Sequence, residues 1–109
     1  MKAAQFAEYG GPEVLVISEV ERPVAGDGMV LVEVHAAGLN PFDAKLRGGA
    51  MKERTPLRLP VTSGGDFAGV VAEIGPGVAG FEPGDKVYAS SNVLAGGSGV
   101  WHPVGWKWD

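Results

Sequence analysis

Short apolar runs separated by glycine and proline set the pattern of this chain. Valine, leucine and isoleucine gather in these runs, and 26 of the 109 residues are glycine or proline. Such punctuation is typical of short strands joined by tight turns. The pattern predicts strands over Lys2–Phe6, Val14–Val20, Met29–Ala36, Phe67–Ile74 and Lys86–Ser90.

The run MVLVEVHA, residues 29–36, has the alternation of a half-buried strand. Because successive side chains of a strand point to opposite faces, Val30, Val32 and Val34 share one face. Leu31, Glu33 and His35 share the other. His35 is therefore expected to face outward, as an ordinary strand residue rather than a ligand.

Proline-glycine pairs predict two type II turns. GPGV at residues 75–78 and EPGD at 82–85 each place proline second and glycine third, as this turn requires. AGDG at 25–28 also predicts a reversal just before a strand. Together the strands and turns predict a mainly β fold, a partly open antiparallel barrel with one or two short helices.

One short helix is predicted from the sequence NPFDAKLRGG, residues 40–49. Asn40 is a favoured N-cap residue, Pro41 suits the first helical position, and Asp43 places its carboxylate near the positive helix end. Gly48 and Gly49 can end the helix in left-handed geometry. Capping alone thus explains the asparagine, the proline, the aspartate and the two glycines.

Capping does not explain the cations of the next stretch. Residues 45–58 contain five cations and a single acid, Glu53, so this stretch carries +4 while the rest of the chain carries −8. The cations are Lys45, Arg47, Lys52, Arg54 and Arg58. A solvated loop face accounts for them, and so does a surface that concentrates an anionic or carbonyl ligand.

Composition narrows the class of protein. A chain of 109 residues can bury one core, and it has no apolar run long enough to cross a bilayer and no secretory h-region. It contains no cysteine, which excludes disulfides and thiolate-bound metal and fits a cytoplasmic protein. The net charge of −4 argues against nucleic-acid binding.

A longer motif gives a more specific indication. The order Gly-x-Asp-x-x-Gly-x-Val, Gly-x-x-Val and Pro-Gly-Asp-x-Val occurs at Gly64, Asp66, Gly69, Val71, Gly75, Val78, Pro83, Gly84, Asp85 and Val87. With AAGLNPFDAKLRGG before it, this region resembles the N-terminal GroES-like domain of the medium-chain dehydrogenase/reductase superfamily. The resemblance covers residues 1–99.

The resemblance points to the branch that works without zinc. Zinc-dependent members have a cysteine where this chain has Asn40, and a His-Glu pair where it has Gly65 and Asp66. Zinc needs a set of thiolate, imidazole or carboxylate donors, and of these positions only Asp66 supplies one. No metal is therefore expected, and Asp66 is expected to organise the turn into its strand. The chain is similar to the quinone and enone reductases, whose members often have Asn-Pro-x-Asp-x-Lys at this helix.

The resemblance also implies roles for the helix. In such reductases NADPH delivers a hydride to a quinone or to an α,β-unsaturated carbonyl, and negative charge builds on the carbonyl oxygen. Lys45 would be the catalytic residue that stabilises this charge. Asn40 would contact the nicotinamide or the substrate carbonyl, and Asp43 would hold the helix and orient Lys45.

The last ten residues, VWHPVGWKWD, do not continue the family pattern. No Gly-x-Gly-x-x-Gly motif opens a helix after a strand, so no Rossmann domain is expected. We therefore expect a GroES-like domain over 1–99 and an atypical tail over 100–109. By itself the chain would bind no cofactor, although the family implies NADPH, and it would be truncated before the cofactor domain and inactive alone.

The tail leads to two further expectations. Trp101, Trp106 and Trp108 would cover apolar surface left by an absent domain, and the chain would form a homo-oligomer through exposed apolar surface. The alternative to a reductase fragment is a non-catalytic GroES-like module used for binding or assembly.

Overall fold

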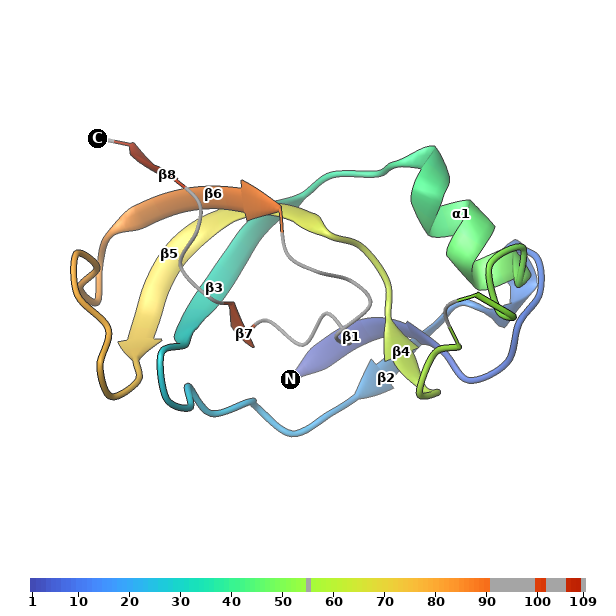
Figure 1. The fold of residues 1–109 in the computed structure, drawn as a ribbon, viewed down its shortest axis with the longest axis horizontal. Coiled ribbons are helices and arrows are strands. Elements are labelled where there is room, and N and C mark those ends of the chain that lie inside the picture. The colour runs from blue at the N-terminus through green and yellow to red at the C-terminus, as the bar shows by residue number, and fades with distance from the viewer. Residues whose placement is uncertain (55, 91–99, 102–105, 109) are drawn as a thin grey trace. The chain divides into compact units, whose positions relative to one another are not determined.

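The computed structural model of the protein describes residues 1–54 and 56–90, and the backbone of two short strands at 100–101 and 106–108. These residues divide into two compact units. Unit 1 contains Met1–Arg22 and Leu39–Gly65, and unit 2 contains Pro23–Gly38, residues 66–90 and the two short strands. Each unit is built on its own antiparallel sheet (Figure 1).

Unit 2 is a five-stranded antiparallel sheet. Its central strands are β3 (Val30–Ala37), β5 (Asp66–Ile74) and β6 (Lys86–Ser90), which run side by side in Figure 1. The short strands β7 (Val100–Trp101) and β8 (Trp106–Trp108) pair with β3 and β6, so the order is β7-β3-β5-β6-β8.

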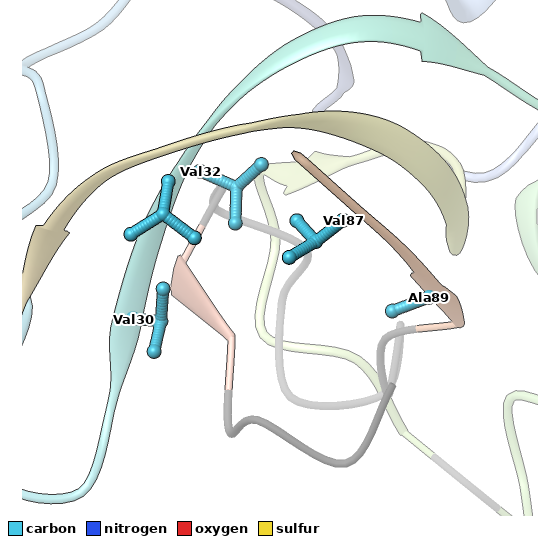
Figure 2. Close-up of a cluster of buried hydrophobic side chains, with 5 residues drawn as sticks. Val30, Val32, Val87 and Ala89 are labelled. Atoms are coloured by element: carbon cyan, nitrogen blue, oxygen red, sulfur yellow. The ribbon is translucent and has the colours of Figure 1, made fainter. Parts of the chain in front are cut away.

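The core of unit 2 lies on one face of this sheet. Val30, Val32, Val71, Val87 and Ala89 form a single buried cluster, in which Val30 and Val87 are 0% exposed. Figure 2 shows these side chains gathered on the same side of the strands. β-Branched residues pack well on a pleated surface, which explains why valine dominates here.

Two irregularities interrupt the pairing of β3 with β5. The register shifts between Leu31 and Val32 and again between Val34 and Ala36. His35 and Ala72 are the residues left without a partner in that register, so each strand contains one extra residue, as in a β-bulge. His35 is exposed, and its Nε2 lies 3.3 Å from Glu33 Oε1, which confirms the prediction that it faces outward.

The turns of unit 2 explain several motif residues. Gly84 has φ +94°, the Asp85 amide donates to the Glu82 carbonyl at 3.1 Å, and the Glu82 amide donates to Asp85 Oδ2 at 2.9 Å. Gly77 likewise has φ +80° in the other predicted turn. These values confirm both type II turns. The turn expected over residues 25–28 lies one residue later, because the Met29 amide donates to the Gly26 carbonyl.

Close backbone contact explains two other glycines. A Cβ on Gly69 would lie 2.0 Å from the Glu33 carbonyl oxygen, and one on Gly75 would lie 1.8 Å from that of Gly26. No side chain fits at either distance. Both glycines therefore allow neighbouring backbone segments to meet.

Unit 1 combines a three-stranded sheet with the helix. Strands β1 (Lys2–Phe6), β2 (Val16–Glu19) and β4 (Val61–Thr62) pair in the order β2-β1-β4. A single 3-10 turn, η1 (Pro12–Val14), precedes β2, and α1 (Pro41–Gly48) comes after β3 in the chain. The buried side chains of this unit are Phe6, Leu46 and Val61.

The described residues confirm a mainly β, partly open antiparallel fold with short helical elements and without a Rossmann domain. β1 and β6 have the predicted bounds, and the other predicted strands differ at their ends. The division into 1–99 and 100–109 stays a prediction. The side chains of residues 91–109 lie outside the described part, and so does the expected covering role of the three tryptophans.

Candidate functional site

Helix α1 is held at its start by two reciprocal hydrogen bonds. Asn40, with extended backbone, accepts a hydrogen bond at Oδ1 from the Phe42 amide at 2.9 Å. Asp43 Oδ2 accepts one from the Asn40 amide at 3.0 Å. This capping box satisfies backbone donors that the first helical turn leaves free. The predicted capping roles of Asn40, Pro41 and Asp43 are therefore confirmed.

The other end of α1 is also closed as predicted. Gly49 has φ +83°, and its amide donates to the Leu46 carbonyl. The Gly10 amide donates to the Arg47 carbonyl at 2.9 Å and ties the helix to the loop after β1. Leu46, 5% exposed, anchors the helix in the core of unit 1. Eight residues are thus fixed by both ends and one buried side chain.

Lys45 is exposed on this fixed helix. It has no ion pair in the part of the chain that the structure describes, and Asp43 is occupied by the Asn40 amide. The capping box brings Asn40 and Asp43 together, whereas no hydrogen bond or ion pair joins Lys45 to either of them among these residues. Lys45 is thus an exposed cation whose charge suits the last turn of α1, and it makes no hydrogen bond or ion pair among the described residues.

Arg47 differs from Lys45 in its surroundings. It is half-buried, and its Nε atom has no hydrogen-bond partner within residues 1–54 and 56–90. A cation in the last turn of a helix is favoured by the negative end of the helix dipole. Helix stability therefore accounts for the presence of Arg47 but not for the orphaned Nε atom.

Among the described residues, the cavity beside α1 is too small for a ligand. Asp43 and Leu46 line a cavity of about 10 Å³ together with Phe6, Val61 and Thr62. This space holds one water molecule at most.

Two arrangements that commonly hold a dinucleotide or a metal are not found among the described residues. All strand pairs among them are antiparallel, so they contain no parallel βαβ unit to receive a pyrophosphate. Within the same residues, no three histidine, cysteine, aspartate or glutamate side chains gather in a way that could hold a metal ion. No helix in that part of the chain is long and apolar enough to span a membrane.

Comparison with known proteins identifies the family of this chain. The family model of the alcohol dehydrogenase GroES-like domain matches residues 26–101, which is more than half of the chain. The chain belongs to this GroES-like family. Human quinone oxidoreductase is 42% identical over 97 residues, which cover 88% of this GroES-like chain and 29% of the human protein.

Two other relatives agree with this result. The chloroplastic NADPH-dependent alkenal/one oxidoreductase of Arabidopsis thaliana is 44% identical over 87% of the GroES-like chain and 25% of its own length. The crystal structure of Escherichia coli quinone oxidoreductase complexed with NADPH matches with a TM-score of 0.78 and 32% identity, covering 92% of this chain and 30% of that one. The predicted resemblance to the quinone and enone oxidoreductase branch is confirmed. The chain spans less than a third of the length of these relatives.

The structure also shows a feature that the sequence analysis missed. In unit 2, the ends of β3, β5 and β6 enclose an open hollow of about 470 Å³ that includes Asp66, Tyr88 and Ser90. The sequence predicts only that Asp66 organises the start of its strand, and the Asp66 carbonyl does accept a hydrogen bond from the Gly38 amide at 2.8 Å. The repeated small residues at these strand ends are the signal that could have indicated the hollow.

Proposed function

We propose that this chain is the substrate-side domain of an NADPH-dependent, zinc-independent quinone or enone reductase. Its membership in the GroES-like family and its similarity to quinone and alkenal/one oxidoreductases support the reaction class. The observation that carries the proposal is the position of Lys45, an exposed cation on a rigid, doubly capped helix. Among the described residues its side chain makes no hydrogen bond or ion pair, and only the end of the helix benefits from its charge.

The proposed chemistry assigns one role to each residue of the helix. When bound, NADPH would supply a hydride to the β-carbon of an enone or to a quinone. The carbonyl oxygen then gains negative charge, and the Lys45 ammonium stabilises it. One such donor contributes about 3 kcal/mol to the transition state. Asn40 contacts the substrate carbonyl or the nicotinamide through its amide nitrogen, because its oxygen is used by the cap. Asp43 keeps the helix start in place.

A chimera tests this proposal. The 109-residue chain replaces the corresponding N-terminal segment of human quinone oxidoreductase, and consumption of NADPH is measured with a naphthoquinone and with a simple enone. We expect turnover in the chimera and none in the 109-residue chain alone. Lys45→Met should lower kcat about 100-fold, whereas Lys45→Arg should retain part of it because the charge remains.

The controls separate catalysis from folding. Both variants should have the melting temperature of the parent chimera, because Lys45 is exposed and unpaired among the described residues. A folded chimera that binds NADPH and keeps its full kcat with Lys45→Met would refute the catalytic role. A chimera that binds NADPH but reduces neither substrate would favour the non-catalytic module.

We also propose a cytoplasmic homo-oligomer. The absence of cysteine supports a reducing compartment. Exposed apolar side chains support self-association, above all Leu39 at 98%, Val24 at 78% and Ile17 at 70%. Light scattering over a range of protein concentrations should give a mass above that of the monomer, and a constant monomer mass would contradict the proposal.

A further inference from the structure

The hollow of unit 2 is a trough that crosses the sheet. Val87 and Ala89 of β6 are buried in the core, so Tyr88 and Ser90, which alternate with them, face away from it. Ala36, Ala68 and Tyr88 are paired across β3, β5 and β6 and form one row on this outer face. Asp66 and Ser90, paired two residues further along, form a second row about 7 Å away.

The row between these two has its side chains on the opposite face. Ala37, Phe67 and Ala89 are paired with one another, and Phe67 packs against the buried cluster that includes Ala89. Among the described residues, the outer face therefore has only backbone between the two outer rows. Small side chains keep this space open, since six of the nine residues that line the trough are alanine, glycine or serine.

The walls of the trough differ in chemistry. Tyr88, 46% exposed, and the methyl groups of Ala36 and Ala68 form an apolar wall with one aromatic ring. The opposite wall is lined by Asp66 and Ser90, whose side chains carry a carboxylate and a hydroxyl. Asp66 also lies directly against Gly38, where a Cβ would approach the Asp66 Cβ to 3.2 Å. Any larger residue at position 38 would press on the acidic wall.

A ligand that complements both walls is apolar on one side and a hydrogen-bond donor on the other. A carboxylate accepts hydrogen bonds and repels carbonyl oxygens, so a phenolic hydroxyl suits it and a quinone oxygen does not. We propose that the trough of unit 2 binds a phenolic aromatic ring, a class that includes hydroquinones, with the ring against Tyr88 and the hydroxyl donating to Asp66. This site belongs to unit 2 alone and does not depend on the proposed reductase activity.

Binding of 2-naphthol to the complete 109-residue chain tests the proposal. The ¹⁵N-labelled protein is titrated with 2-naphthol, with its methyl ether and with 1,4-naphthoquinone, and the amide chemical shifts are followed. We expect saturable shifts from 2-naphthol at Ala36, Ala68, Tyr88 and Ser90. The methyl ether lacks the donor, and its affinity should be lower by a factor of about five or more. The same loss is expected for the quinone.

Matched variants locate the interaction. Asp66→Asn removes the charge while keeping the shape, and should weaken 2-naphthol binding about fivefold. Asp27→Asn makes the same change at an exposed aspartate of unit 2 that does not line the trough, and should leave binding unchanged. Ala68→Leu should fill the trough and abolish binding. The amide spectrum of each variant shows whether it has kept the parent fold.

Several outcomes would overturn the proposal. Equal affinity for 2-naphthol and its methyl ether would remove the role of the carboxylate. Shifts confined to residues outside the trough would place the ligand elsewhere, and unchanged binding in folded Ala68→Leu would do the same. An absence of saturable shifts with every probe would refute the site altogether.

Discussion

In unit 2, Asp85 accepts a hydrogen bond from the Glu82 amide and closes a turn, whereas in unit 1 Asp43 accepts one from the Asn40 amide and closes the start of a helix. Each aspartate accepts a hydrogen bond from the backbone amide three residues before it, one at a β-turn and the other at the start of a helix. The segments after the two aspartates differ. In unit 2 the chain passes into β6 and the valine core, and in unit 1 it passes into exposed cations.

This difference indicates where chemistry should be sought in the motif. The glycines at 69, 75 and 84 allow close backbone contact or a positive φ, so they would be needed in a protein without any activity. Asn40 and Asp43 are also needed for the fold. Lys45 makes no hydrogen bond or ion pair among the described residues, which is why the proposed catalytic role rests on it rather than on the residues that make the motif recognisable.

The largest effect should come from a methyl group at the tightest backbone contact. Gly69→Ala would place Cβ 2.0 Å from the Glu33 carbonyl oxygen and force β3 and β5 apart. We expect the free energy of unfolding to fall by about 3 kcal/mol or more. Urea denaturation followed by circular dichroism measures this loss.

The same substitution in unit 1 is the control. A Cβ on Gly48 meets nothing within 4 Å, and this glycine lies in the last turn of α1. Gly48→Ala should therefore stabilise the protein, by about 0.5 kcal/mol. If both substitutions change the free energy of unfolding equally, close backbone packing at Gly69 is not what makes that glycine necessary.

A smaller effect is expected at the helix cap. Asn40→Ala removes the acceptor for the Phe42 amide and should lower the free energy of unfolding by about 1 kcal/mol. Thermal unfolding monitored by circular dichroism reports this change. Asn40→Asp keeps an acceptor at the same place and should restore most of the stability.

The chimera with human quinone oxidoreductase turns this pair into a test of function. In it, Asn40→Asp should lose turnover while keeping stability, because the proposed contact uses the amide nitrogen. Full turnover with Asn40→Asp would assign Asn40 to capping alone.

Much of the fold could be predicted because local rules and the tertiary structure agree. Both ends of α1 were predicted correctly, because the residues there follow capping preferences: Asn40, Pro41 and Gly49. Both type II turns were also predicted correctly, because Gly77 and Gly84 follow a turn preference. β4 was missed because two residues, Val61 and Thr62, give no periodic signal. The bulge at His35 was missed because the prediction assumed that side chains alternate strictly between the two faces along the whole strand, which leaves no residue unpaired.

The site was less accessible to sequence reasoning. The capping part of the helix could be predicted, since it depends on neighbours within four residues. The trough could not, because Ala36, Ala68 and Tyr88 meet only through the pairing of three strands. Their register depends on the irregular pairing of β3 with β5. These two strands are far apart in the sequence, so a pattern within a short stretch cannot indicate how they pair.

That ladder has a further property. The sum of paired residue numbers is 104 at Val30 with Ile74, 103 at Val34 with Gly69, and 104 again at Ala37 with Phe67. One insertion in each strand therefore cancels the other, and the two ends of the ladder share a frame. The chain could lose His35 and Ala72 together and every remaining residue would keep its partner, whereas deletion of one paired residue from either strand would shift the register by one and turn buried valines outward.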